Sequence, residues 1–402
     1  MPSDTPAEPQ SPIRLLHLTL AKDQTANPAF KQVTTHKMDS PYSRELEIAF
    51  SVLRAAASLS QSIISSNDKG VIDKNHPEDG FDAVTIADFA IQALLAATFH
   101  LHFPQDILVG EESADKLRGD PKLLGRIWEL LVGVGKEHSP LFRIPGTEED
   151  ACDLIDMCGE GNPGPGRVWV FDPIDGTKGF VKGELYAINI ALLVDGKQVL
   201  SAVACPNLSP DVSGTIGDKD VDQSGRGSIF FAVRGYGAFI MPLDGEDRPR
   251  RLNPHPPAPR KEDLRFVSCS TIPTSGSNEF HQAVASSLGM SFPGCDLVPW
   301  VVRWASLAIG LGNTTVWVYN RLGRRGKTWD HAGAMLLFEE TGGKVTDVFG
   351  RDIDVAAGRT LGANFGFVAS LVDLHQTVLN ATQKTLMEFG REDVLREGGL
   401  LG

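Results

Sequence analysis

The sequence predicts an α/β protein with two domains. At 402 residues the chain is longer than one ordinary domain and long enough to bury a large core. Amphipathic helical segments and short apolar strands share the first half, and from about residue 264 strands and helices alternate along the chain. Such alternation is typical of sheets that are covered by helices.

The first 40 residues lack sustained periodicity, and the opening MPSDTPAEPQ has two acids, three prolines and no basic residue. We interpret residues 1–40 as a disordered tail. Apolar positions at helical spacing then predict a helix within SPYSRELEIAFSVLRAAASLSQSIISS, after a Ser-Pro start. DAVTIADFAIQALLAATFHLHFP predicts a short strand or turn that leads into a second helix ended by Pro104. We expect these two helices to pair.

Short apolar strands follow the helices. DILVGEES stops on a glycine and two glutamates, and RVWVFD is a second strand after a polar excursion over residues 113–166. AINIALLVDGKQVLSAVACP contains two strands joined by Asp-Gly, which is a strong hairpin signal. SIFFAV and GAFIMP are further strands, and NPHPPAPRKEDL is expected to be a linker or surface crossing.

The second half reads as RFVSCS, a helix near 278–288, VVRWASLAIGLG, TTVWVYN, a helix over about 331–340, and GKVTDVFG. The predicted organisation is an N-terminal α+β domain at 41–205, a C-terminal α/β domain at 206–390 and a tail at 391–402.

Composition argues against several classes of function. A net charge of −13 argues against binding a nucleic acid polymer, which usually needs a basic face. The longest apolar runs are too short and too periodic for a membrane span. Five widely spread cysteines without a C-x-x-C pair favour a reducing compartment, and the first ten residues match neither a secretory nor a transit signal. We therefore expect a cytoplasmic protein, with no obligate protein partner evident.

The stretch VFDPIDGTKGF, residues 170–180, has the strongest chemical signal. A strand that ends on Asp172 and Asp175 with a proline between them bends sharply, so both carboxylates and the carbonyl of Ile174 can converge. Such a set of oxygens suits a hard cation of the Mg²⁺ type. Gly176 and Thr177 then begin a turn whose backbone N–H groups can hold a phosphate beside the metal.

Acids also stand at the ends of other predicted elements. Glu111 and Glu112 close the strand ILVG, Asp330 follows a tryptophan at the head of a helix, and Asp88 lies in VTIAD. Each has a structural explanation when it is taken singly: a helix cap for Asp330 and Asp88, and a surface turn residue for Glu111.

Taken together, GEES, DPIDGTKGF and WDHAGA in this order resemble the lithium-sensitive, magnesium-dependent phosphatases of the inositol monophosphatase superfamily. The resemblance runs from about residue 42 to 385 and includes VTIAD, CPN, AVRGYGAF, LAIGLG and GRTLG. DPIDGTKGF is similar to the 3′(2′),5′-bisphosphate nucleotidase branch, because inositol monophosphatases usually have Thr-Asn-Phe where this chain has Lys-Gly-Phe. The resemblance implies alternating helix and sheet layers with an active cleft between two domains.

The resemblance also implies a role for each acid. The metal ligands would be Glu111, Asp172, Asp175, Asp330 and the carbonyl of Ile174, which would hold two to three Mg²⁺ ions. Asp88 would help to hold a further metal or its water, so the implied catalytic residues are Asp88, Glu111 and Thr177. Thr177 would contact the attacking water and, with the amide of Gly176, the phosphate. Paired ions lower the pKa of a bound water and neutralise charge on the entering and leaving oxygens.

The substrate side matches the nucleotidases less completely. TIPTSGSNEF has no histidine where they have a His-Ser stretch, although Ser275, Ser277 and Asn278 could donate hydrogen bonds instead. Arg303 stands in place of a lysine and could hold a phosphate bidentately, and Trp300 stands in place of a serine. The predicted substrate-binding residues are Gly176, Thr177, Ser277, Arg303 and Asp330.

Two further positions on the substrate side are ambiguous. Where the nucleotidases have an arginine, this chain has Tyr319 or Asn320, with Arg321 nearby. The tryptophans at 300, 304 and 317 could line a pocket, although core packing is the commoner role of such residues.

Three functions remain open. The first is Mg²⁺-dependent hydrolysis of the 3′-phosphate of adenosine 3′,5′-bisphosphate, and also of 3′-phosphoadenylyl sulfate, with inhibition by Li⁺ expected from the family. The second keeps the chemistry but takes an inositol phosphate or another small phosphate ester, which the altered pocket motivates. The third is a non-hydrolytic scaffold in a specialised pathway, against which the complete set of implied ligands argues.

Overall fold

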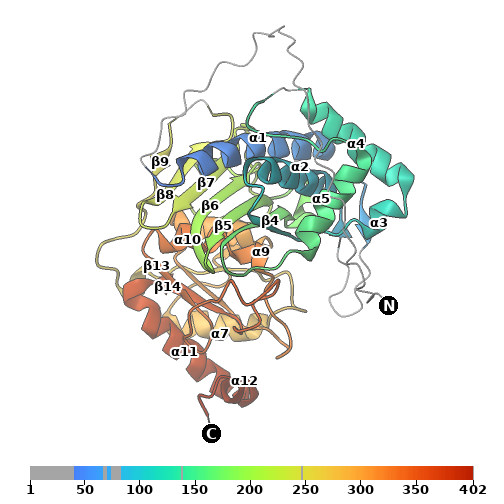
Figure 1. Ribbon diagram of the computed structural model, residues 1–402. Coiled ribbons are helices and arrows are strands. Elements are labelled where there is room, and N and C mark those ends of the chain that lie inside the picture. The colour runs from blue at the N-terminus through green and yellow to red at the C-terminus, as the bar shows by residue number, and fades with distance from the viewer. Residues whose placement is uncertain (1–39, 67–69, 74–82, 137–138, 246–247, 402) are drawn as a thin grey trace, which may run out of the picture. The chain divides into compact units, whose positions relative to one another are not determined.

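The computed structural model describes residues 40–66, 70–73, 83–136, 139–245 and 248–401 (Figure 1). The predicted tail at 1–40 lies outside these residues except for its last position. The segment predicted as a C-terminal tail, 391–402, contains helix α12 (Glu392–Glu397).

The helices of the first half are α1 (Ser43–Ser65), α2 (Ile86–His102), α3 (Asp115–Arg118), α4 (Pro121–Gly135) and α5 (Glu148–Glu160). Side chains cap the N-termini of three of them. Thr85 accepts a hydrogen bond from one backbone N–H group of α2, Asp120 accepts from two N–H groups of α4, and Thr147 accepts from one N–H group of α5. Helices α1 and α2 pack against each other, so the predicted pairing is confirmed. α1 has the length and composition of a membrane span, but about half of it is buried, with its apolar side chains in a core shared with the sheet.

Seven described strands form the central sheet, in the order of the chain: β3 (Ile107–Gly110), β4 (Arg167–Asp175), β5 (Ala187–Val194), β6 (Lys197–Cys205), β7 (Ser228–Val233), β8 (Gly237–Pro242) and β9 (Arg250–Arg251). β3 and β4 are parallel, and the other neighbours are antiparallel. The predicted Asp-Gly hairpin joins β5 to β6, with both turn residues at positive φ (48° and 77°). The predicted domain boundary at 205/206 falls between β6 and β7, which are paired in this sheet.

Both faces of the central sheet are covered, because side chains of a strand point alternately to opposite faces. Trp169 and Phe171 of β4 belong to the core that contains α1 and α2. Val168 and Val170 belong to a second core, which contains α8 (Trp300–Ala308) and α10 (Ala334–Glu339). Residues 168–171 of β4 are therefore apolar on both faces of the sheet, as the sequence VWVF indicates.

The second half adds two more layers. Three described strands form an antiparallel sheet in the order β12 (Thr314–Trp317), β14 (Phe367–Leu371), β13 (Gly343–Thr346). Helices α7 (Asn278–Leu288) and α11 (His375–Glu388) pack against this sheet, and α10 contacts both sheets. Figure 1 shows the resulting sequence of layers within residues 40–401, and the predicted layered α/β fold is confirmed.

The remaining described elements are short: β1 (Ile72–Asp73), β2 (Ala83–Val84), α6 (Thr177–Lys182), β10 (Val267–Ser268), β11 (Cys295–Asp296), α9 (Thr328–His331) and two 3₁₀ turns at Lys261–Asp263 and Val372–Leu374.

One predicted helix is divided in two. The segment 331–340 was expected to be continuous, but α9 ends before Gly333 and α10 begins after it. The side chain of Asn189 on β5 donates to the carbonyl of Trp329 at 2.6 Å, and so takes an acceptor that a continuous helix would use. A Cβ atom on Gly333 would lie 2.3 Å from the same asparagine, so only glycine permits this close approach.

Candidate active site

The two acids at the end of β4 lie on a bulge. Asp172 pairs with Asn189 of β5 and Asp175 with Ala187, so β4 has one extra residue between the two pairs. The N–H of Ile174 donates to Asp172 Oδ1 at 3.1 Å. Both aspartates are buried: the exposed fraction of the surface is 1% for Asp172 and 8% for Asp175. The bend predicted at this point is this bulge, and it brings both acids to one end of the strand.

The turn after β4 packs against the second half of the chain. Gly176 has φ +90°, and a Cβ atom there would lie 2.5 Å from the side chain of Pro299, so the position requires glycine. Thr177 begins α6, and its hydroxyl donates to the carbonyl of Ile174 at 3.2 Å. The predicted phosphate-binding turn and the predicted carbonyl ligand are therefore in contact.

Asp175 is also bonded to α8. The N–H of Val301 donates to Asp175 Oδ2 at 2.6 Å, so this carboxylate satisfies a free amide at the start of that helix. Burial raises the pKa of Asp175 to about 7, although this hydrogen bond and the positive charge of Arg303 act in the opposite direction.

Asp330 reaches the same region through α9. Asn189 pairs with Asp172 across the sheet and also holds the carbonyl of Trp329, the residue before Asp330. Burial raises the pKa of Asp330 well above its ordinary value, and the charges of Asp175 and Glu111 raise it further. Acids from widely separated parts of the chain therefore interact electrostatically.

Four neighbouring acids act on Asp172. Its pKa is raised well above the ordinary value by burial and then by the charges of Glu111, Asp175, Asp330 and Asp88. All five acids that the sequence singled out are thus electrically coupled around Asp172.

Asp88 caps a helix as well. Its Oδ2 accepts hydrogen bonds from the backbone N–H and from the hydroxyl of Thr85, both at 2.7 Å, which makes a capping box at the start of α2. The structural explanation for Asp88 is confirmed, and its predicted role toward a metal or its water stays a prediction.

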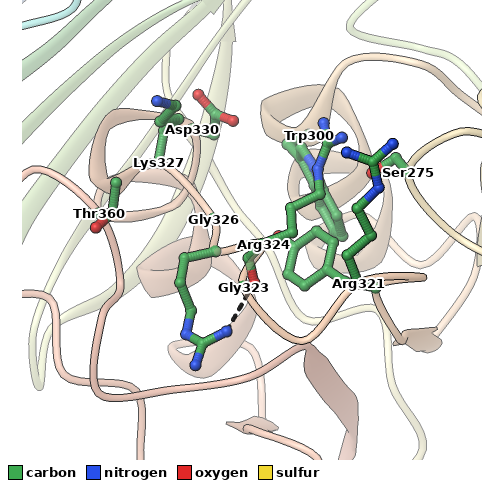
Figure 2. Close-up of a pocket in the computed structure, with 11 residues that line it drawn as sticks. Ser275, Trp300, Arg321, Gly323, Arg324, Gly326, Lys327, Asp330 and Thr360 are labelled. Carbon is green, nitrogen blue, oxygen red and sulfur yellow. Dashed lines mark hydrogen bonds between the residues drawn. The ribbon is translucent and has the colours of Figure 1, made fainter. Parts of the chain in front are cut away.

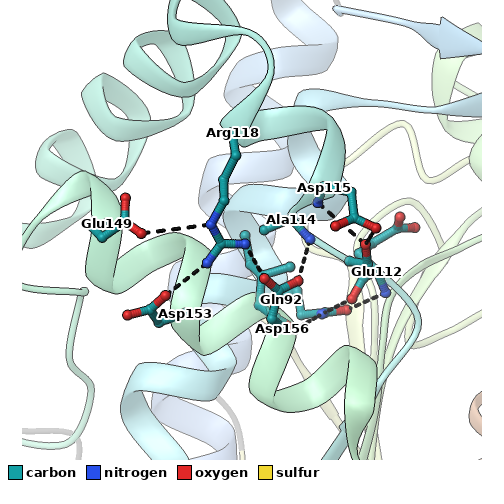
Figure 3. Close-up of polar contacts among 10 residues, drawn as sticks. Gln92, Glu112, Ala114, Asp115, Arg118, Glu149, Asp153 and Asp156 are labelled. Atoms are coloured by element: carbon teal, nitrogen blue, oxygen red, sulfur yellow. Dashed lines mark hydrogen bonds and ion pairs between the residues drawn. The ribbon is translucent and has the colours of Figure 1, made fainter.

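The loop that carries Glu111 and Glu112 is fastened to two helices (Figure 3). Gln92 of α2 donates to the carbonyl of Glu112 and accepts from its N–H, both at 2.8 Å. Asp156 of α5 accepts from the N–H of Ala114 at 2.6 Å and is paired with Arg118. Gln92 and Asp156 both belong to the first half of the chain, so these hydrogen bonds fix the loop within that half.

A pocket of about 500 Å³ opens beside Asp330 (Figure 2). It is lined by Ser275, Trp300, Tyr319, Arg321, Gly323, Arg324, Arg325, Gly326, Lys327, Asp330 and Thr360. Figure 2 shows Asp330, Lys327 and Thr360 on one side, and Trp300, Ser275, Arg321 and Arg324 on the other. The pocket is strongly basic, although the protein as a whole carries a net charge of −13.

Known proteins resemble this chain over most of its length. A family model described as "Inositol monophosphatase family" matches residues 42–387. A 3′(2′),5′-bisphosphate nucleotidase of Emericella nidulans is 35% identical over 86% of this chain and 99% of its own length. One of Schizosaccharomyces pombe is 34% identical over 85% of this chain and 95% of its own.

The chain belongs to the inositol monophosphatase family.

Solved structures of the family share the fold. A Thermotoga maritima IMPase superposes with a TM-score of 0.53 at 18% identity and covers 86% of this chain and 98% of its own. An IMPase/NADP phosphatase complexed with Mg²⁺ and phosphate superposes with a TM-score of 0.54 at 20% identity. The match covers 85% of this chain and 96% of that structure's chain. At these identities the likeness supports the layered fold.

The acids of this inositol monophosphatase family member suit a divalent cation chemically. They are oxygen donors of the kind that Mg²⁺ prefers, and burial with mutual repulsion raises the pKa of three of them. A cation among them would relieve both costs. Among the described residues, no three His, Cys, Asp or Glu side chains converge closely enough to form a complete site for one ion.

The predicted substrate residues of this family member lie in different places. Ser277 caps α7 by accepting from the N–H of Phe280, whereas Ser275 lines the pocket. Arg303 is 1% exposed and donates to the carbonyls of Leu297 at 2.6 Å and Val298 at 2.8 Å. Neither Ser277 nor Arg303 lines the pocket of Figure 2.

Trp300 separates Arg303 from the pocket. The Arg303 guanidinium lies 4.0 Å from the ring centre of Trp300 and 4.9 Å from that of Trp317. Trp304 and Trp317 are buried in the core, as the commoner role predicts, but Trp300 lines the pocket.

Most of the pocket's cations were not predicted from the sequence. Arg324, Arg325 and Lys327 lie with Arg321 in the segment RLGRRGK, which follows β12 and ends just before α9. A basic run so close to a predicted ligand, in a chain that is acidic overall, was the available signal.

Proposed function

We propose that this protein is a Mg²⁺-dependent phosphatase that removes the 3′-phosphate of adenosine 3′,5′-bisphosphate, and of 3′-phosphoadenylyl sulfate, in the cytoplasm. The observation that carries the proposal is the basic pocket that begins at Asp330. A substrate with one phosphate at the acids and a second anionic group some distance away matches this distribution of charge. The names of the relatives from Emericella nidulans and Schizosaccharomyces pombe support the same substrate.

The proposal assigns a role to each residue of the site. Bound Mg²⁺ ions would supply an activated water and charge neutralisation. Glu111, Asp172, Asp175 and Asp330 would hold the ions. The Thr177 hydroxyl, which donates to the Ile174 carbonyl, would orient the attacking water, and the amides of Gly176 and Thr177 would receive the phosphate.

The pocket favours a nucleotide over an inositol phosphate. The indole of Trp300 offers an apolar, aromatic surface for a planar base, and stacking on aromatic side chains contributes about 1–3 kcal/mol per base in nucleic-acid-binding proteins. Arg321 and Arg324 lie on the same side as this indole (Figure 2), where a phosphate joined to the nucleoside could reach them. An inositol monophosphate has no aromatic ring and no second phosphate, so it would leave both features unused.

Phosphate release from a substrate panel tests the proposal. With Mg²⁺, we expect the protein to release phosphate from adenosine 3′,5′-bisphosphate much faster than from inositol 1-phosphate, and to lose this activity in excess chelator. Comparable rates on the two substrates would favour a broader small-ester phosphatase. Release from no member of the panel would favour the non-hydrolytic scaffold.

The paired variant Arg321→Ala, Arg324→Ala tests the second anionic group. We expect it to raise the KM for adenosine 3′,5′-bisphosphate by about 10- to 100-fold with little change in kcat, since hydrogen bonds to charged groups contribute about 1.5–3 kcal/mol. Adenosine 3′-monophosphate lacks the 5′-phosphate, so its kinetics should change less than threefold.

Arg396→Ala is the matched control, because Arg396 lies on α12 with 60% of its side chain exposed and does not line the pocket. It should leave both substrates unaffected. An equal loss on both substrates in the paired variant would contradict the assignment of these arginines to the second phosphate.

A further inference from the structure

Arg359 links the segment that carries Glu111 to the segment that carries Asp330. We propose that it is a positioning residue, which sets the distance between these two predicted metal ligands without touching the substrate itself. The inference rests on the proposed function, because it assigns Arg359 a role in assembling the same metal-binding site.

The side chain of Arg359 holds the first-half segment. Its Nη2 donates to the carbonyl of Gly110 at 2.5 Å, and Gly110 directly precedes Glu111. Its Nη1 donates to the carbonyls of Cys158 and Gly161, each at 3.0 Å, at the C-terminal end of α5. One planar guanidinium thus ties the end of β3 to the end of a neighbouring helix.

The backbone segments that carry these carbonyls are closely packed against their neighbours. A Cβ atom on Gly161 would lie 1.8 Å from the carbonyl oxygen of Leu108, and one on Gly110 would lie 2.7 Å from Gln92 Oε1. Both positions therefore require glycine, and the backbone around Glu111 has little room to shift. The hydrogen bonds of Arg359 are made to a rigid partner.

The backbone of the same residue holds the second-half segment. The carbonyl of Arg359 accepts from the N–H of Thr328 at 3.0 Å, and the Thr328 hydroxyl donates to the carbonyl of Gly358 at 2.6 Å. Thr328 is the first residue of α9, which carries Asp330. The guanidinium also lies 4.8 Å from the ring centre of Trp329, the residue before Asp330.

The charge of Arg359 suits this position. Glu111 and Asp330 repel each other, and each belongs to a separate part of the chain. A cation fastened beside Glu111 offsets part of this repulsion while its hydrogen bonds fix the geometry. Gln92 and Asp156 hold the Glu111 loop within the first half (Figure 3), whereas Arg359 connects it to the second half.

Mg²⁺ binding measured by calorimetry tests the inference directly. For Arg359→Gln we expect a Kd for Mg²⁺ about 10- to 100-fold higher than for the wild type, as is typical when a residue behind the ligands is removed. The Mg²⁺ concentration for half-maximal activity should rise by the same factor. The KM for the nucleotide at saturating Mg²⁺ should stay within twofold, because the pocket arginines are unchanged.

Arg351→Gln is the matched control. Arg351 also donates to a backbone carbonyl, that of Gly398 at 2.7 Å, and its guanidinium lies 5.0 Å from the ring centre of Phe349. This variant removes the same charge and the same kinds of contact, so it should lower the melting temperature but leave the Kd for Mg²⁺ within twofold of the wild type.

Arg359→Lys supplies a second test should the glutamine variant fail to fold. Lysine keeps the charge but lacks the planar fork, so we expect Mg²⁺ binding between that of the wild type and that of Arg359→Gln. A folded Arg359 variant with wild-type affinity for Mg²⁺ would overturn the inference. A wild-type protein that neither binds Mg²⁺ nor releases phosphate would overturn the proposed function instead.

Discussion

Asp175→Asn is expected to slow phosphate release from adenosine 3′,5′-bisphosphate by about 1000-fold or more, because loss of a metal ligand removes several kcal/mol of transition-state stabilisation. The fold should survive the change. Asparagine keeps an oxygen that can accept from the N–H of Val301, so the bond to α8 is retained. Initial rates at saturating Mg²⁺ measure the loss of activity. Circular dichroism and a melting curve on the same sample show whether the variant is folded.

Asp218→Asn is the control for this prediction. Asp218 accepts from the N–H of Val298 at 2.8 Å, only three residues from the partner of Asp175, and burial raises its pKa to about 6. It is not among the predicted metal ligands, so its neutral variant should keep at least about a third of the wild-type rate, a loss below 1 kcal/mol. An active Asp175→Asn enzyme would contradict the assigned ligand set.

Asp330→Asn is expected to have opposite effects on stability in the absence and in the presence of Mg²⁺. In the metal-free protein, burial and the charges of Asp175 and Glu111 raise the pKa of Asp330 above its ordinary value of 3.8. The folded state therefore binds a proton more tightly than the unfolded state, and this contribution to stability is lost as the pH rises above 3.8. Asparagine carries no charge at any pH, so it avoids the loss.

Melting curves in chelator at pH 5 and pH 8 measure this effect. We expect metal-free Asp330→Asn to melt at a higher temperature than the metal-free wild type at pH 8, with a smaller difference at pH 5. Adding Mg²⁺ should reverse the order, because a ligand present at 100 times its Kd stabilises the wild type by about 2.7 kcal/mol, or about 3 °C for a chain of this length. A metal-free variant less stable than the wild type at pH 8 would contradict the predicted repulsion.

Local patterns in the chain were sufficient to predict most of the elements. The spacing of apolar residues predicted α1 and α2, and Asp195-Gly196 predicted the β5–β6 hairpin, because each depends on the geometry of a few consecutive residues. The division of α9 from α10 was not predicted. It depends on Asn189, which is 140 positions before the carbonyl that it binds, and no local periodicity contains that information.

The same distinction applies to the site. Asp172, Asp175, Gly176 and Thr177 form one continuous motif, so their grouping could be predicted from one short stretch. Glu111, Asp330 and Asp88 each have an ordinary local explanation, and only the family resemblance grouped them. The packing of side chains decides which arginines reach the pocket. Arg303 stacks on Trp300 and does not line the pocket, whereas Arg321 and Arg324 line it.

The family, the layered fold class and the residue types available for metal and phosphate chemistry follow from motifs and periodicity along the chain. Which cations face the pocket, and how acids from both halves come together, depends on contacts between distant segments. Asn189 and Arg359 make that connection through hydrogen bonds to backbone carbonyls. Every residue has such a carbonyl, so no feature of the sequence identifies in advance which one a side chain will bind.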